Sequence, residues 1–338
     1  MSIVQETIDV FPFTAAPRVL QRREELLLTP PVNFGNELAP LEVVHFDIEY
    51  APVPFAPPTG TYEGDYLRME WQTMNFRQPF YHRNTDVDEL SYQINGERTL
   101  MTEFGTVELV PGDFSRIPRG VAHDNYGREE SHLLFYLPAP VQDLQSPAKS
   151  SAPTIPPFAG WEPAPKIEFI TDCLGGPGHA PVSVLAIDEQ LLLEQAGHET
   201  DRINVLRADQ ADAGTTWLYR SQDIMIGRAW DRSADGRNYQ RHLDVDEIQY
   251  QISGQRTLIT QRGTLHVEPG DLVRIPVGVS FASLHHDQSA HLRLVSRHPV
   301  PQVAPTDRKA VQVTVDDVER LRRGEHTGAH PTEVSADV

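Results

Sequence analysis

Short runs of alternating apolar and polar residues recur along the chain and end at glycine- or proline-containing turns. In Leu90–Ile94 (LSYQI) and Thr106–Val110 (TVELV), every second side chain points to the same face of a strand. The turn sequences Asn95–Glu97 (NGE), Glu103–Gly105 (EFG) and Pro111–Asp113 (PGD) follow at short spacing. Closely spaced antiparallel strands with glycine and proline at their corners predict an all-β fold of the jelly-roll or small-barrel type.

Helical patterning is scarce, and its clearest instance lies near the C-terminus. Thr314 is a suitable N-cap, Asp317 falls in the first turn, and Gly324 ends the segment. The residues between them that carry a partial apolar stripe are Val315, Val318, Leu321 and Arg322. The sequence therefore predicts a short helix in this region, followed by a polar tail.

An internal repeat organises the chain. The segment Asp86–His123 matches Asp244–Phe281 at a constant offset of 158 residues, with 22 of 38 positions identical and no insertion or deletion. Such self-similarity indicates two copies of one structural unit. The chain is thus predicted to contain two β-barrels of the same type.

Proline content marks the boundary between the two copies. Pro138–Pro165 holds eight prolines in 28 residues, a composition that cannot continue a sheet ladder and is typical of an extended linker. We therefore expect five parts, described by residue number: an irregular, proline-rich N-terminal segment (1–60), a first barrel (61–140), a linker (141–165), a second barrel (166–310), and a short helix with a tail (311–338).

Charge and cysteine content narrow the classes of partner and compartment. Lys plus Arg number 29 and Asp plus Glu 48, so the formal net charge is 29 − 48 = −19, which repels phosphate backbones and anionic membranes. The single cysteine, Cys173, excludes an intrachain disulfide and a cysteine-based zinc cluster. The start of the sequence does not read as a secretory signal, and no apolar run is long enough to span a bilayer. We expect a cytoplasmic protein that binds neither nucleic acid nor membrane.

A set of candidate metal ligands lies in the first copy. His82 and Asn84 share one face of a strand, Glu89 enters the next strand after a short turn, and His123 follows the Pro118-to-Gly120 turn. Two imidazoles and one carboxylate should converge inside the barrel. Such a set leaves coordination positions open and is typical of non-haem Fe(II) enzymes that bind dioxygen and an organic substrate.

These residues support a metal prediction with three open points: the metal, the carboxylate and the role of Asn84. We predict His82, Glu89 and His123 as ligands of Fe(II), with Mn, Ni or Zn as alternatives, because ligand types alone do not fix the metal. An alternative register would let Asp88 replace Glu89. Asn84 is a weak fourth ligand, a residue that fixes a water or substrate hydroxyl, or simply an amide that closes the turn.

The second copy lacks most of this set. At the 158-residue offset, Gln240 replaces His82, His242 replaces Asn84 and Phe281 replaces His123, while Glu247 keeps the place of Glu89. The glycine and proline positions of the motif remain, so the second copy should keep the fold without a catalytic metal. A rescued site that uses His285 or His286 is a minor alternative.

The motif residues resemble those of a known superfamily. His82, Asn84, Glu89 and Gly96, followed by Gly112, Pro118, Gly120 and His123, resemble the two motifs of the cupins, in which His-x-His is the usual start of the first motif. The resemblance implies two cupin barrels of the double-stranded β-helix (jelly-roll) type.

Within the cupins, Phe80–Asn84 with Glu89 looks like the His-Arg-Asn plus Glu signature of homogentisate dioxygenases. The two-barrel layout is also similar to gentisate dioxygenases and to the large subunits of two-component hydroquinone dioxygenases. The chain departs from the homogentisate enzymes in two ways. Four residues separate Asn84 from Glu89, where that family has three, and the intact site lies in the first barrel, where that family has it in the C-terminal one.

The resemblance implies an iron-dependent dioxygenase that uses O2 to cleave the ring of a hydroquinone-like aromatic. Asn84, Gln93 and Arg119 are then candidate catalytic residues: Gln93 for a substrate hydroxyl and Arg119 for a substrate carboxylate. Gln93 recurs as Gln251 and therefore also fits a structural role.

Two other functions are compatible with the same residues. One is a metal-dependent cupin decarboxylase or isomerase, and the other is a non-catalytic metabolite-binding or scaffold subunit. For assembly we expect a homo-oligomer, or a hetero-oligomer with a small subunit.

Overall fold

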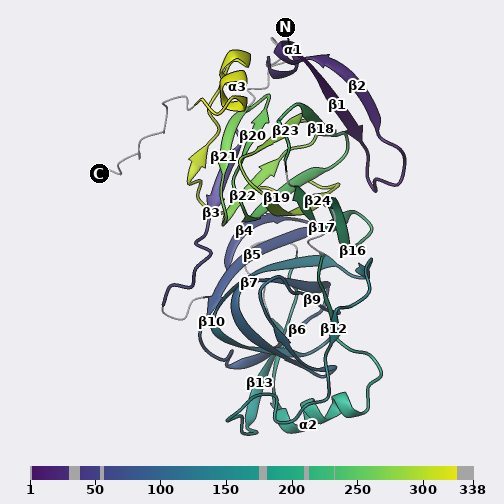
Figure 1. Cartoon of the computed structure of the whole chain (residues 1–338). Helices are drawn as coiled ribbons and strands as arrows, with labels where there is room; N and C mark the ends of the chain where they lie inside the picture. The colour runs from purple at the N-terminus through teal and green to yellow at the C-terminus, as the bar shows by residue number, and fades with distance from the viewer. Residues whose placement is uncertain are drawn as a thin grey trace.

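The molecule is built from two β-barrels that follow one another along its long axis (Figure 1). The computed structural model describes residues 2–29, 39–53, 57–174, 181–208, 213–231 and 233–325. Strands dominate, and three α-helices occur in these ranges. The predicted all-β fold class with two jelly-roll barrels and few helices is confirmed. Within the described residues, no helix is long and apolar enough to cross a membrane.

The first barrel is formed around two long strands, β7 (Val87–Thr102) and β10 (His123–Pro138), which pair antiparallel along most of their length. Its other strands are β4 (Thr59–Gly64), β5 (Leu67–Met74), β6 (Phe80–Asn84), β8 (Gly105–Leu109) and β9 (Phe114–Ile117). Strand β10 also pairs with β5 and β6, and β7 with β8 and β9, which closes the barrel.

The second barrel repeats this order of strands. They are β16 (Gly214–Arg220), β17 (Ile224–Asp231), β18 (Asn238–His242), β19 (Asp246–Ser253), β20 (Arg256–Thr260), β21 (Gly263–Val267), β22 (Asp271–Ile275), β23 (Phe281–His285) and β24 (Ser289–Ser296). The pairing of β24 with β17 and β19 corresponds to that of β10 with β5 and β7.

The glycine that recurs at one turn has a steric explanation. Gly96 and Gly254 have φ of 61° and 70°, a region that side chains disfavour. A Cβ at Gly96 would lie 2.3 Å from the carbonyl oxygen of Glu129, and one at Gly254 would lie 2.1 Å from that of Gln288. Both barrels therefore need glycine where the chain turns at this end.

Residues 1–60 differ from the irregular segment expected from their composition. They form β1 (Ile3–Asp9), β2 (Arg18–Arg23), α1 (Glu24–Leu28), β3 (Glu42–His45) and the start of β4. Strand β1 pairs in parallel with β18, and β3 pairs antiparallel with β22. This first arm, β1 to β3, thus extends the sheets of the second barrel, a long-range pairing that local patterning does not reveal.

A second arm makes the reciprocal connection. It consists of β13 (Pro165–Thr171), β14 (Pro181–Asp188), α2 (Glu189–Glu194), a 3-10 turn (Gln195–Gly197) and β15 (Asn204–Leu206). Strand β13 pairs in parallel with β6, and β15 pairs antiparallel with β9. Residues 166–206, expected in the second barrel, therefore add strands to the first, and the two arms are exchanged between the barrels.

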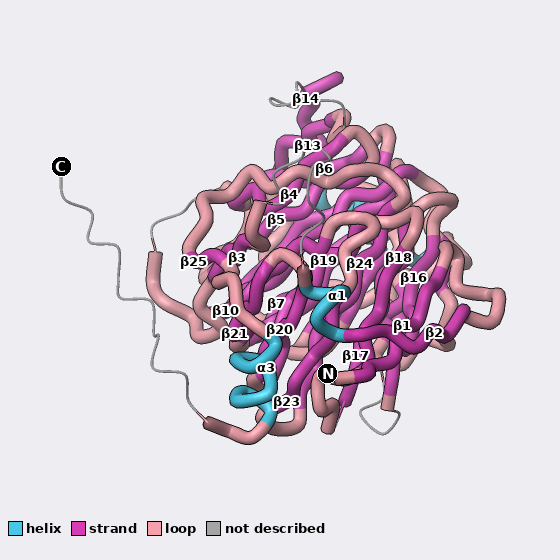
Figure 2. Tube along the Cα trace, turned by 90° about the horizontal axis from the view of Figure 1, so that it is seen from above, coloured by secondary structure: helices cyan, strands magenta, loops and turns pink. Residues whose placement is uncertain are grey.

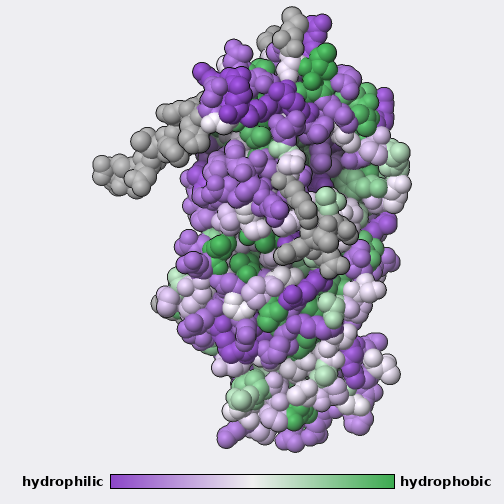
Figure 3. Space-filling view, in the orientation of Figure 1, coloured by the Kyte–Doolittle hydropathy of each residue, from purple (hydrophilic) through white to green (hydrophobic). Residues whose placement is uncertain are grey.

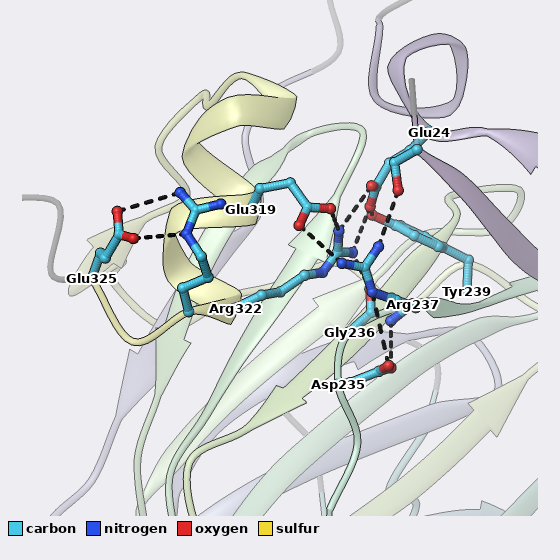
Figure 4. A network of polar contacts seen from close by, with 10 residues as sticks. Glu24, Asp235, Gly236, Arg237, Tyr239, Glu319, Arg322 and Glu325 are labelled. Atoms are coloured by element: carbon cyan, nitrogen blue, oxygen red, sulfur yellow. Dashed lines mark hydrogen bonds and ion pairs between the residues drawn. The ribbon is translucent and has the colours of Figure 1, made fainter.

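Each arm is fixed by a buried glutamate at the start of its helix. Glu24 of α1 accepts a hydrogen bond of 2.7 Å from the Tyr239 hydroxyl, and Glu189 of α2 accepts one of 3.1 Å from Tyr81. Arg322 also binds the Glu24 carboxylate (Figure 4), whereas Arg77 binds Glu189. Tyr81 and Tyr239 are 158 residues apart, the offset of the repeat, whereas their glutamate and arginine partners are not related by that offset. We call each Tyr–Glu–Arg set a latch.

The remaining segments connect and close the barrels. The linker carries only β11 (Gln142–Asp143) and β12 (Lys149–Ser150), and the C-terminal part carries β25 (Arg308–Lys309) and α3 (Val315–Arg322). Thr314 and Asp317 form a capping box, and Gly324 ends the segment with φ of 72°, as predicted. Helix α3 packs beside α1 (Figure 2). The predicted tail beyond residue 325 lies outside the described residues.

One apolar core joins the two barrels. It includes side chains from both repeats, among them Tyr92 and Tyr250, whose ring centroids are 6.4 Å apart. The recurrence of this tyrosine thus reflects packing between the barrels. The face seen in Figure 3 is largely hydrophilic, with separate apolar patches.

Candidate metal centre

Three strands of the first barrel bring the predicted ligands together. His82 lies on β6, Glu89 near the start of β7, and His123 at the start of β10, directly paired with His82. Glu89 Oε2 lies 3.3 Å from His123 Nε2 and 4.0 Å from His82 Nδ1, and the two imidazole centroids are 5.3 Å apart. One ligand atom from each residue can be chosen so that all lie within 4.8 Å of one another.

This arrangement fits a single metal ion. Two ligand atoms bound about 2.1 Å from one metal at a right angle lie about 3 Å apart, close to the Glu89–His123 separation. Glu89 and His123 are buried, and His82 is partly exposed, so the set has one accessible side. Two neutral imidazoles and one carboxylate leave several coordination positions for other ligands.

The local electrostatics favour an ionised carboxylate at the centre. Burial alone would raise the pKa of Glu89, but the two imidazoles and a neighbouring amide lower it to about 2. Burial lowers the pKa of His123 and the Glu89 carboxylate raises it, with a net upward shift. Because the carboxylate stays ionised, the site carries the negative charge that a divalent cation needs.

Asn84 holds the carboxylate in place. Its Nδ2 donates a 2.9 Å hydrogen bond to Glu89 Oε2, and its Oδ1 accepts one of 3.0 Å from the Cys173 thiol. This role, the positioning of a metal-ligand candidate, was not among the alternatives that the sequence left open for Asn84. The position of the Asn84 side chain is in turn fixed by the second arm, which carries Cys173.

Glu89, and not Asp88, faces the two histidines. Asp88 points to the other side of β7, where it accepts hydrogen bonds from Arg116 and from the backbone nitrogens of Arg119 and Val141. The same outward pair recurs in the second barrel, where Arg274 lies 2.6 Å from the equivalent Asp246. The alternative register is therefore excluded.

The other two candidate catalytic residues make contacts with other groups than the ligands. Gln93 is buried, and its Nε2 donates to Glu130 Oε2 at 2.7 Å and to the carbonyl oxygen of Asn95 at 2.8 Å. Arg119 is exposed on the turn before β10, and its backbone nitrogen binds Asp88. Among the described residues, no hydrogen bond or ion pair joins the side chain of Gln93 or Arg119 to the three ligands.

Several residues at the site were not found by sequence reasoning. Thr171 at the end of β13 contacts His82 Nε2, and Cys173 follows it. The pKa of the Cys173 thiol is raised to about 12 by burial and by Glu89, so the thiol is neutral. Both residues come from the second arm, outside the repeated motif, and only the parallel pairing of β13 with β6 brings them here.

In the second barrel a guanidinium group takes the place of a metal. Arg293 of β24 binds Glu247 through two hydrogen bonds, of 2.8 Å to Oε1 and 2.7 Å to Oε2, and its NH2 also lies 3.2 Å from His242 Nε2. Burial would raise the pKa of Glu247, but Arg293 lowers it well below its usual value. The expected loss of the metal site is thus accompanied by a cation from the protein itself.

Another group of potential ligands lies at the surface of the second barrel. His45, Glu268 and Asp271 are near one another, but His45 Nδ1 is 2.8 Å from Asp271 Oδ1, and Arg308 binds both acids. The charges of this group are therefore already compensated by Arg308.

Comparisons with known proteins found likeness in three dimensions only. No family model matches the sequence, and no curated protein matches it. A cupin 2 conserved barrel domain protein from Leptotrichia buccalis is 8% identical with a TM-score of 0.45, and the match covers 73% of this chain and 92% of that one.

Two solved enzymes were also found. A deletion mutant of oxalate decarboxylase from Bacillus subtilis is 12% identical (TM-score 0.44; 81% of this chain and 82% of that one). A mutant of salicylate 1,2-dioxygenase from Pseudoaminobacter salicylatoxidans is 13% identical (TM-score 0.42; 73% and 79%). The strand pairing described above forms two jelly-roll β-barrels in one chain, with a candidate metal site in the first.

Proposed function

We propose that the first barrel holds a single Fe(II) ion and uses O2 to cleave the ring of a hydroquinone-like aromatic, of the homogentisate, gentisate or hydroquinone type. The observation that supports this most directly is the facing set of His82, Glu89 and His123. Bound there, Fe(II) would supply a redox-active centre with open positions for dioxygen and a ring hydroxyl.

The protein side chains have separate tasks in this proposal. His82, Glu89 and His123 hold the ion, and Asn84 keeps the Glu89 carboxylate oriented toward it. Glu70 and Tyr136 are buried near Glu89, and burial with the Glu89 charge raises the pKa values of both groups. Buried side chains around the ligands, among them the neutral phenol of Tyr136, exclude bulk water and favour a substrate that presents an aromatic face.

The substrate would approach from the partly exposed side of His82, where Thr171 of the second arm lies. Gln93 and Arg119 remain proposals as substrate-contacting residues, and each requires a side-chain rearrangement to reach the site. A metal-dependent decarboxylase uses the same ligand types, and O2 uptake distinguishes the two reactions.

The deciding experiment measures O2 uptake by Fe(II)-reconstituted protein with a panel of catechols and hydroquinones. We expect uptake with at least one para-diphenol and none in His123→Ala, which removes a ligand. His198→Ala, a substitution of the same type at an exposed histidine, should behave as the wild type. Absence of uptake with every ring diol, or equal uptake by His123→Ala, would contradict the proposal.

A further inference from the structure

A cavity of about 820 Å³ opens in the second barrel, at the end equivalent to the one that carries the candidate ligands in the first barrel. Gln240 and Phe281, which stand at the positions of His82 and His123, lie in its wall, together with Arg293. The upper barrel in Figure 1 contains the strands that line it, β16, β17, β18, β19, β23 and β24. Its further lining residues include Thr215, Trp230, Asn238, Gln249, Ser283 and His291.

The interior of this barrel carries more positive charge at matched positions than that of the first barrel. Strand register aligns Gln251 with Gln93, and therefore Ser289 with Glu130. The amide of Gln251 donates to Ser289 Oγ at 2.8 Å, as that of Gln93 donates to the Glu130 carboxylate. One buried carboxylate has thus been lost.

The same register aligns Arg293 with Leu134, so one guanidinium has been gained. The buried arginine of the first barrel, Arg98, is retained as Arg256, and Glu89 is retained as Glu247. Two guanidinium groups therefore face one carboxylate in the interior of the second barrel.

Arg256 has no carboxylate partner within hydrogen-bonding distance among the described residues. It is fully buried and donates to the neutral oxygens of Gln251 (2.7 Å), Gln249 (2.6 Å) and Ser283 (3.0 Å). Gln249 and Ser283 both line the cavity, so Arg256 lies directly behind its wall. Burial lowers the pKa of Arg256 to about 9, which reflects the cost of an uncompensated charge.

Polar groups in the cavity wall also lack protein partners. His291 is 8% exposed, and its imidazole makes no hydrogen bond within the described parts of the chain. Gln240 is exposed to the opening, and its amide likewise has no partner there. An imidazole and an amide are thus available to donate to a ligand, next to a positive interior.

We propose that the second barrel binds a small organic carboxylate in this cavity. The carboxylate lies toward Arg293 and the wall in front of Arg256, which supply the compensating positive charge, and its oxygens accept hydrogen bonds from His291 and Gln240. Trp230 and Phe281 contact the apolar part of the ligand. Three carboxylates also line the cavity: Asp235 and Asp287 are exposed to water, which weakens their repulsion, and Asp231 is partly exposed.

Isothermal titration calorimetry with two probes of the same shape tests this site. Benzoate carries the charge and benzamide does not, and we expect benzoate to bind at least about tenfold more tightly. Gln240→Glu and Asn238→Asp place a negative charge at the opening, on exposed side chains that are expected to tolerate substitution. Each should weaken benzoate binding at least about tenfold, and Asn238→Asp, which removes no proposed ligand donor, should leave benzamide binding unchanged.

Two control variants locate the effect. Gln142→Glu, on β11 outside the cavity, adds the same charge and should leave benzoate binding unchanged. His123→Ala removes a ligand from the first barrel and should also leave it unchanged, which separates this site from the proposed metal centre. Thermal unfolding confirms that each variant is folded. Equal binding of the two probes, no benzoate binding at millimolar concentration, loss of binding in His123→Ala, or unaltered binding in both opening variants would overturn the proposal.

Discussion

The two barrels share a strand order and differ in how each compensates the same buried glutamate. Glu89 faces two histidines and an amide donor, an arrangement that fits a metal ion. Glu247 faces Arg293, whose guanidinium makes two hydrogen bonds to it. The comparison teaches that a barrel of this kind needs a cation beside its buried carboxylate, and that a side chain can replace the metal without loss of the fold.

The largest expected effect comes from making the first barrel like the second. His123→Phe copies the residue at the equivalent position, Phe281, and removes one of three ligands. We expect metal affinity to fall by more than about 100-fold, the upper range for residues that only support a ligand. Iron per chain after reconstitution, measured by elemental analysis, checks this prediction.

The reverse exchange is the matched control. Phe281→His should add no second metal ion per chain, because Gln240 supplies no imidazole and Arg293 already binds Glu247. Full iron content in His123→Phe, or a second ion in Phe281→His, would show that the two barrels do not differ as described.

Removing the internal cation of the second barrel should be nearly as severe. Arg293→Leu introduces the residue found at the matched position, Leu134, but leaves the buried Glu247 carboxylate without its guanidinium partner, with hydrogen bonds only from His242 (2.8 Å) and Gln249 (2.6 Å) among the described residues. We expect a loss of about 3–5 kcal/mol in the free energy of unfolding, measured in urea. Adding Glu247→Gln should restore part of it, and a double variant as unstable as the single one would argue against the pair.

The same variant should change how stability depends on pH. In the wild type, Arg293 lowers the folded-state pKa of Glu247, so its contribution is present above the unfolded pKa of about 4.3 and is lost as pH falls through the lower folded value. In Arg293→Leu, burial without a guanidinium raises the folded-state pKa of Glu247 above 4.3. As pH falls, Glu247 therefore takes up a proton in the folded state before it does so in the unfolded state. The difference in unfolding free energy between the variant and the wild type should shrink between pH 7 and pH 5, by up to about 1.4 kcal/mol for each unit by which the pKa of Glu247 is raised. A deficit that is constant over this range would contradict the charge-based explanation.

A smaller effect is expected from the amide that orients the metal-binding carboxylate. Asn84→Ala removes the 2.9 Å hydrogen bond to Glu89 and should weaken metal binding about 10- to 100-fold while leaving some iron bound. Cys173→Ala, which removes only the thiol that donates to Asn84, should have a weaker effect of the same kind. Competition titration with a chelator ranks the three proteins, and a Cys173→Ala effect equal to that of Asn84→Ala would show that the thiol acts directly.

The sequence predicted the parts of this comparison that are encoded locally. The 158-residue repeat, the alternation in the strands, the set of His82, Glu89 and His123, and the Thr314 cap all depend on residues close in sequence or on fixed spacing. Arg293 was missed because it lies in β24, beyond the repeated segment, and because one residue shifts the register between the two copies there. The exchanged arms were missed because the pairing of β1 with β18 joins residues more than 200 positions apart. The residues of a strand do not show which distant strand it pairs with.

The smallest expected effects concern the latches, and they test whether the arms serve the barrels that they cover. Tyr239→Phe removes a 2.7 Å hydrogen bond to Glu24, and Tyr81→Phe removes one of 3.1 Å to Glu189. We expect Tyr239→Phe to cost about 1.5 kcal/mol in unfolding free energy and Tyr81→Phe less, since the shorter bond to a carboxylate is the stronger one. Their effects on the metal site should run in the opposite order. Only the second arm, held by Glu189, carries Thr171 and Cys173 to the ligands, so Tyr81→Phe should weaken metal binding slightly and Tyr239→Phe should not. If both variants change metal affinity equally, the arms affect the metal site only through the overall stability of the protein. If only Tyr81→Phe changes it, the second arm is part of the metal site.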